Sequence, residues 1–119
     1  MKRKKKTTPT QRSLKKLRDE GWTAAVVEKW NPHVGIRQDL WGFGDLLCFK
    51  DDVVLIVQTT VAANVATRLL KIEANPITKR WIASQYRLIV VHGWSKRGAR
   101  GKRKLWTCRE VYYAGDPKF

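Results

Sequence analysis

Two polar residues in the middle of the chain have the types and the spacing of a metal site. Apolar runs at 45–50 and 53–59 flank two aspartates at 51–52, a pattern that predicts a β-hairpin. A two-residue turn places opposite each other those residues whose numbers sum to 103, and Asp45 and Gln58 satisfy this condition. Carboxylate and amide oxygens are ligands that Mg²⁺ accepts in proteins. The register therefore predicts a magnesium site at the open end of the hairpin; the alternative is that Asp45 only begins a strand and Gln58 is a hydrogen-bonded buried amide.

Three more side chains are candidates for the same site. Glu28 follows a strand-like run at 22–27 and could supply a second carboxylate, and Asp39 lies in the irregular segment that comes next. Thr60 lies two residues after Gln58 and shares its face if the strand continues, because side chains alternate between the two faces of a strand.

The elements that must position these residues alternate between helix and strand. The patterning predicts an amphipathic helix at 11–20 stopped by Gly21, a strand at 22–27, an irregular connection at 29–43, the hairpin, a helix at 61–74 ended by Pro76, further helical turns within 78–85, a buried strand at 86–92 and a last strand at 105–113. This order is typical of a single α/β domain with a mixed central β-sheet flanked by helices. On the second helix, Arg68 and Lys71 continue a polar stripe that starts at Asn64.

The charge of the chain indicates a polyanionic partner. Lysine and arginine number 25 against 10 acidic residues, and the net charge is +15 over 119 residues. Eleven of the positive charges belong to two segments without acids. We expect residues 1–10 to be a disordered basic arm, or alternatively a solubilising or address tail, and 11–119 to be one domain with a basic loop at 95–104. The basic loop is expected to contact the phosphates of a nucleic acid through Lys96, Arg97, Arg100, Lys102, Arg103 and Lys104.

Several classes of protein are excluded or disfavoured. No apolar run reaches the ~18–20 residues that span a bilayer, and the basic N-terminus lacks the apolar stretch of a secretory signal. Cys48 and Cys108 have no Cys or His at ligand spacing, so no zinc site is predicted. Two reduced, buried thiols are favoured over a disulfide, which indicates an intracellular protein.

Three other residues have a structural and a functional interpretation. His92 ends an apolar strand, and a hydrogen-bonded structural role is favoured over that of a catalytic base. Trp41 and Trp94 border the proposed site; they either pack in the core, which is favoured, or stack on exposed bases.

The segment from about 11 to 92 resembles the PD-(D/E)XK nuclease fold, and it is most similar to archaeal-type Holliday junction resolvases and small phage nuclease-like proteins. The resemblance rests on the order of helix, strand with an acid, Gly44-Asp45 opening a hairpin, Gln58-Thr59-Thr60 ending a buried run, then helix and strand. It implies a restriction-endonuclease-like αβββαβ core, with Asp45 as the first acid of the motif, Gln58 in place of the second and Glu28 as the preceding acid.

The sequence departs from this family in two ways that bear on the chemistry. The neutral Gln58 is a weaker metal ligand than the acid it replaces, and the lysine of the family is missing. Thr60 stands where the family has a lysine that positions and activates the attacking water. Metal-bound water is acidic without such help, and Arg68 or Lys71 on the next helix could supply the missing positive charge.

The resemblance implies a Mg²⁺-dependent DNA endonuclease, with Mn²⁺ as a substitute ion, that acts on branched or otherwise structured DNA. A homodimer would suit the cutting of two strands, and the expected location is the cytoplasm of a prokaryote or of a phage-infected host. The alternatives are a non-catalytic nucleic-acid-binding protein on a decayed nuclease fold and an RNA-binding protein of the ribosome-associated type.

Overall fold

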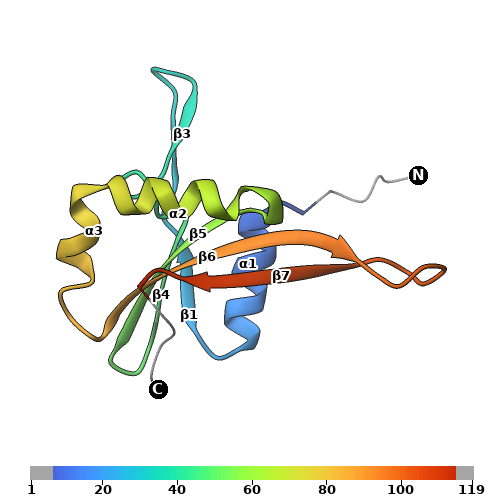
Figure 1. Cartoon of the computed structure of the whole chain (residues 1–119). Coiled ribbons are helices and arrows are strands. Elements are labelled where there is room, and N and C mark those ends of the chain that lie inside the picture. Colours follow the sequence, from blue (N-terminus) through green and yellow to red (C-terminus); the bar gives the residue numbers. More distant parts are fainter. Residues whose placement is uncertain (1–6, 115–119) are drawn as a thin grey trace.

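A mixed five-stranded β-sheet forms the centre of the molecule (Figure 1). The structure is a computed structural model that describes residues 7–114; the predicted arm therefore lies mostly outside the described residues. The strands follow the order β1-β4-β5-β6-β7, with β5 and β6 parallel and the other neighbouring pairs antiparallel. This arrangement confirms the predicted α/β class with a mixed sheet. The elements are α1 (Pro9–Asp19), β1 (Thr23–Val26), β2 (Lys29–Asn31), β3 (Ile36–Gln38), β4 (Leu46–Lys50), β5 (Val53–Val61), a 3₁₀ turn η1 (Ala62–Asn64), α2 (Val65–Ala74), α3 (Pro76–Trp81), β6 (Arg87–Arg97) and β7 (Leu105–Tyr112).

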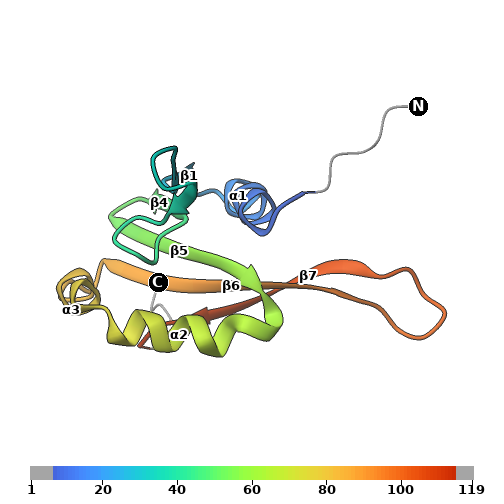
Figure 2. The same ribbon diagram turned by 90° about the horizontal axis from the view of Figure 1, so that it is seen from above.

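Helices cover both faces of the sheet. Helix α1 lies on one face, and α2 and α3 lie on the other (Figure 2). Alternate residues of β5 therefore enter two separate cores: Leu55 and Val57 pack beneath α1, whereas Ile56 packs beneath α2. A strand buried on both faces is apolar throughout, which is the pattern that identified β5 as a central strand.

Asn75 and Pro76 separate helices α2 and α3. The helix predicted at 61–74 ends at Ala74 as expected, but its α-helical part begins only at Val65, after the 3₁₀ turn at 62–64. Pro76 not only follows this helix but also begins the next one, α3. Proline suits the first turn of a helix because its missing N–H has no partner there in any case. The Asn75 side chain caps α3 by accepting a hydrogen bond from the backbone N–H of Ile77 at 2.9 Å. At the other end of the chain, α1 begins at Pro9 with Thr8 as its cap, so the domain starts before the predicted boundary at residue 11.

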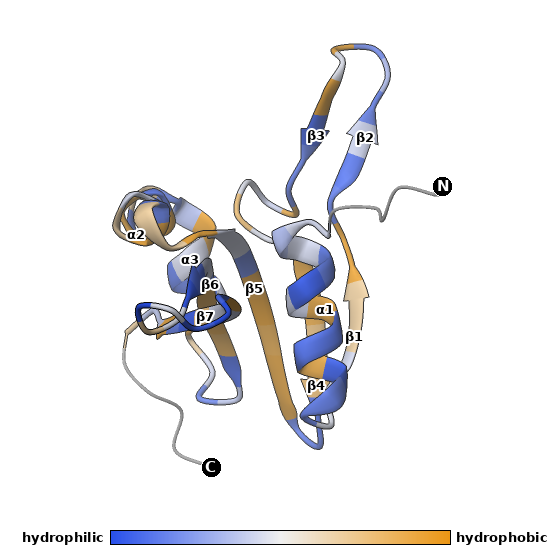
Figure 3. Ribbon diagram, turned by 90° about the vertical axis from the view of Figure 1, so that its right-hand side faces the viewer, coloured by the Kyte–Doolittle hydropathy of each residue, from blue (hydrophilic) through white to orange (hydrophobic). Residues whose placement is uncertain are grey.

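The segment 29–43, predicted to be irregular, contains a second small sheet. Strands β2 and β3 pair in antiparallel fashion, and the hairpin projects from the body of the molecule (Figure 3). Among residues 7–114, no helix has the length and apolarity needed to cross a membrane.

Strands β6 and β7 extend well beyond the sheet body as a two-stranded ribbon (Figure 1). The pairing continues to Arg97↔Leu105, whereas the strand at 86–92 was predicted to end at His92. Lys96 and Arg97 therefore lie on strand β6, and the connecting turn is confined to 98–104. The predicted basic loop at 95–104 is thus the tip of a two-stranded ribbon, in which 95–97 belong to strand β6, rather than a loop throughout.

Gly93 allows α2 to approach the end of the sheet. A Cβ atom at Gly93 would overlap Cγ2 of Val65 and lie 3.0 Å from Cα of Ala62. We expect Gly93→Ala to lower the free energy of unfolding by about 1–3 kcal/mol, the usual cost of overpacking. Chemical denaturation measures this loss. A Val65→Ala, Gly93→Ala double variant should lose less than the sum of the two single variants, and strict additivity would contradict the proposed overlap.

Candidate metal centre

The hairpin has the predicted register. Leu46 lies opposite Val57 and Lys50 opposite Val53, so the paired residue numbers sum to 103. The backbone N–H of Asp45 continues the ladder by donating to the carbonyl oxygen of Val57 at 2.9 Å. Asp45 and Gln58 consequently meet at the open end of the hairpin, on the face covered by α2.

The Asp45 carboxylate is buried and firmly held. Its Oδ2 atom accepts three hydrogen bonds: from Gln58 Nε2 at 2.9 Å, from the Thr59 backbone N–H at 2.7 Å and from the Thr59 hydroxyl at 3.1 Å. Only 4% of Asp45 is exposed. Thr59 was not among the predicted site residues, although its place beside Gln58 at the end of a buried strand was a usable signal.

Gln58 has an unused ligand atom. Because its amide nitrogen donates to Asp45, its Oε1 is left free, and within residues 7–114 this buried oxygen has no hydrogen-bond partner. Burying a polar atom without a partner costs free energy. An amide oxygen that binds a cation would remove that cost, which is the first indication that the residues present fit a metal ion.

Three carboxylates gather at this point. Glu28, Asp39 and Asp45 each offer an oxygen atom, and these atoms lie within 4.8 Å of one another. Burial raises the pKa of Asp45 to about 8, an effect that the neighbouring Asp39 and Glu28 reinforce and the Thr59 N–H opposes. Three carboxylates so close together cannot all stay ionised without a neutralising charge. A divalent cation would supply that charge, and the oxygen-only donor set suits Mg²⁺ or Mn²⁺.

The connection between β1 and β4 brings two of the three acids to the site. Glu28 lies just before β2 and Asp39 just after β3, so the β2–β3 hairpin closes the distance between them. Leu40 and Gly44 then form an isolated bridge, with Leu40 N–H donating to the Gly44 carbonyl at 2.7 Å. The tight turn returns the chain to Asp45. Asp39, which the sequence suggested only as a further candidate, thus belongs to the cluster.

Two basic side chains approach the acids from the outside. Lys71 Nζ lies 3.9 Å from Asp39 Oδ2, and Arg37 NH1 lies 3.4 Å from Glu28 Oε1. Arg68 contacts none of the three acids in the described part of the chain. Of the two predicted cations on α2, Lys71 is therefore the one beside the acids. A cavity of about 370 Å³ adjoins this place and is lined by Arg37, Gln38, Asp39, Trp41, Gly42 and Lys71.

Of the remaining residues singled out in the sequence, Thr60 and Trp94 are buried and Trp41 is exposed. Thr60 is buried at the same end of β5 and provides no charge. Trp94 is 7% exposed and donates its indole N–H to Ser13, so for Trp94 the core interpretation is confirmed. Trp41 is 47% exposed and borders the cavity, so for Trp41 the favoured core interpretation is wrong.

His92 is hydrogen bonded as predicted, and of the two cysteines only Cys48 has the predicted full burial. His92 is buried, with Nδ1 hydrogen bonded to the Ser13 hydroxyl at 2.9 Å. Cys48 and Cys108 are both free thiols; Cys48 is buried, whereas Cys108 is only partly so. Burial raises the pKa of each thiol to about 12, so both are protonated at neutral pH.

Comparison with known proteins adds no relative to this picture. No family model, no curated protein and no solved structure matches the chain.

Proposed function

We propose that the protein is a metal-dependent endonuclease that hydrolyses phosphodiester bonds in DNA. The observation that carries the proposal is the cluster of Glu28, Asp39 and Asp45 beside the unpaired amide oxygen of Gln58. A second observation is the net charge of +15, which favours a nucleic acid as the partner. Acidic residues would repel the phosphates of that partner, so a cluster of acids in such a basic chain favours a catalytic role over simple binding. The order α1, β1, β4, β5, α2, β6, with the β2–β3 hairpin inserted after β1, is similar to the αβββαβ core of the PD-(D/E)XK resemblance, which motivates the same proposed activity.

The residues divide the chemical work between them. Glu28, Asp45 and Gln58, with Asp39, would hold Mg²⁺ or Mn²⁺, which when bound supplies a more acidic water and a Lewis acid for the phosphate. Lys71 would stabilise the charge that grows on the phosphate in the transition state. Thr59 and Gln58 hold the Asp45 carboxylate in a single orientation, which saves reorganisation during the reaction.

The basic ribbon β6–β7 is the proposed grip on DNA. All six of the predicted cationic side chains at 96–104 are exposed along the ribbon tip. A two-stranded ribbon is narrow enough for the major groove, which is about 12 Å wide. Branched or structured DNA is the proposed substrate, and a homodimer would place two such sites against two strands.

A cleavage assay on a set of DNA shapes tests the proposed activity. Duplex, single-stranded, flap and four-way DNA are incubated with Mg²⁺, with Mn²⁺ or with a chelator. We expect cleavage that requires the ion and that is fastest on a branched form. Tight DNA binding without cleavage under any of these conditions would contradict the proposal and favour the non-catalytic alternative, which the neutral Thr60 supports.

Lys71 should matter more for cleavage than for binding. Because Lys71 lies beside Asp39 and Arg68 contacts none of the acids, Lys71→Ala should lower the cleavage rate by about 10²–10³-fold, and Arg68→Ala should have a smaller effect. Single-turnover rates with saturating enzyme separate this loss from weaker binding. Thr60→Lys, which restores the cation at the family position, should recover part of the loss in a Lys71→Ala background. Full activity in the Arg68→Ala, Lys71→Ala double variant would show that neither cation takes part.

A further inference from the structure

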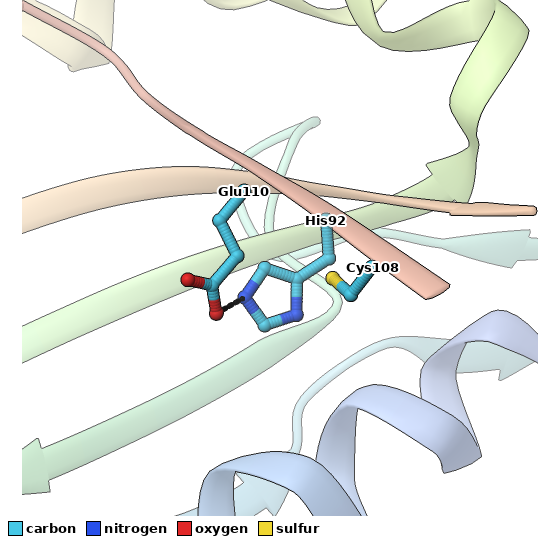
Figure 4. Close-up of side chains that lie close together, drawn as sticks. All are labelled: His92, Cys108 and Glu110. Atoms are coloured by element: carbon cyan, nitrogen blue, oxygen red, sulfur yellow. Dashed lines mark ion pairs between the residues drawn. The ribbon is translucent and has the colours of Figure 1, made fainter. Parts of the chain in front are cut away.

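A second cluster of metal-ligating groups lies on the other face of the sheet, under α1. In the β6–β7 ladder His92 lies opposite Glu110 and Trp94 opposite Cys108, so these four residues share a face. One ligand atom each from His92, Cys108 and Glu110 lies within 4.8 Å of the others. Figure 4 shows the three side chains converging, with the imidazole between the thiol and the carboxylate.

We propose that His92, Cys108 and Glu110 form a binding site for a zinc-type divalent ion. One imidazole, one sulfur and one carboxylate make up a three-residue set of the kind that holds Zn²⁺ tetrahedrally, with a water in the fourth position. The soft sulfur ligand selects against Mg²⁺, so this site and the carboxylate cluster would take different ions. The proposal is independent of nuclease activity.

The imidazole is already oriented for such a role. His92 Nδ1 is hydrogen bonded to Ser13 Oγ at 2.9 Å, and Ser13 Oγ in turn accepts from Trp94 Nε1 at 2.8 Å. Ser13 and His92 are both essentially unexposed. This chain leaves Nε2 directed at Glu110, whose Oε1 lies 3.3 Å away. Histidine ligands of metals commonly have their second ring nitrogen held by an outer partner in this manner.

Glu110 makes the site accessible from solvent, and it also pairs with Lys16, whose positive charge competes with a bound ion. The Glu110 side chain is 36% exposed, which gives an ion a route of entry. Lys16 Nζ lies 3.5 Å from Glu110 and 3.0 Å from Glu20, so the lysine can remain with Glu20 when an ion takes its place at Glu110. An ion that binds Glu110 has to displace Lys16 from this carboxylate, so removing the lysine charge should strengthen ion binding. The protonated state of the Cys108 thiol is no obstacle, because a coordinating thiol is deprotonated by the ion itself.

Titration of the metal-free full-length protein with Co²⁺, a spectroscopic substitute for Zn²⁺, tests the site. We expect a thiolate-to-cobalt charge-transfer band in the near ultraviolet and strong visible bands of tetrahedral Co²⁺, both abolished by one equivalent of Zn²⁺. Cobalt bound by Glu28, Asp39 and Asp45 has no sulfur ligand and cannot produce the charge-transfer band. The readout thus stays meaningful even if the protein cleaves no DNA.

Matched variants locate the ion. Cys108→Ser should abolish the charge-transfer band, whereas Cys48→Ser, which removes the other thiol, should keep it. Ser13→Ala should weaken binding by about 10–100-fold, the usual cost of losing an outer partner, and Lys16→Gln should strengthen it. Near-ultraviolet circular dichroism confirms that each variant is folded. A wild-type protein without the band, or a band that survives in Cys108→Ser, would overturn the proposal and leave His92 and Glu110 as a structural ion pair.

Discussion

Asp45→Asn should reduce Mg²⁺-dependent cleavage of DNA by about 10³-fold. The side chain keeps its size and one oxygen, so the hairpin end stays packed, but the carboxylate charge that would hold the ion is lost. Metal ions contribute several kcal/mol to phosphoryl transition states, and ~4 kcal/mol corresponds to about 10³ in rate. Single-turnover cleavage of the DNA form that the wild-type protein cuts best is the measurement. DNA affinity, measured in the absence of cleavage, should stay equal or rise, because a negative charge near the phosphates has been removed.

Two further variants make this result specific. Glu28→Gln removes a second acid of the cluster and should reduce cleavage in the same direction. Asp52→Asn makes the same chemical change at the exposed turn of the same hairpin, away from the cluster, and should leave the rate unchanged. Wild-type cleavage by Asp45→Asn would show that the cluster is not the metal site of the reaction, whatever the activity of the protein.

Replacing the six cations of the ribbon tip by serine should flatten the salt dependence of DNA binding. Each lost phosphate contact removes about 0.9 from the slope of log affinity against log salt, so six contacts correspond to a change of about 5. Affinity should fall almost equally for all sequences, because phosphate contacts carry no base information. The set comprises Lys96, Arg97, Arg100, Lys102, Arg103 and Lys104. Fluorescence anisotropy over a salt series measures both the slope and the affinity.

A pairwise comparison controls for the loss of overall charge. Lys102→Ser with Arg103→Ser should lower the slope by about 2. Lys79→Ser with Arg80→Ser removes the same charge from exposed positions on α3, which lies away from the ribbon, and should leave the slope nearly unchanged (Figure 1). Equal changes in the two pairs would mean that general charge, and not the ribbon, governs binding.

The hairpin register was predictable because every contribution to it is local. The turn at 51–52 sets which residues of β4 and β5 lie opposite each other, and the apolar run at 53–59 can only be buried centrally. Asp45 and Gln58 are therefore placed together by a short segment of chain. The α/β class follows in the same way from helical and strand periods that can be read within a few residues.

The sequence alone did not show how Glu28 and Asp39 come to lie beside Asp45 in the carboxylate cluster. Glu28 and Asp39 lie on either side of the β2–β3 hairpin, whose pairing was not evident from a segment interrupted by Pro32 and Gly35. Whether Arg68 or Lys71 reaches the acids depends on the rotation of α2 over the sheet. That rotation is set by the packing of Val65 and Ile72 and by the close approach at Gly93, not by the polar stripe itself.

The sequence by itself determined the class of fold, the central strand, the meeting of Asp45 with Gln58 and the excess of positive charge. Only the tertiary structure decided that Asp39 joins the acids, that Lys71 approaches them, and that His92 meets Cys108 and Glu110. The last case shows the physical reason most clearly. The register of the β6–β7 pair depends on the turn at 98–104, and the glycines in this turn allow several conformations. The sequence near the turn therefore does not determine that His92 lies opposite Glu110. The long ladder between β6 and β7, with the packing of α1 against it, selects that pairing.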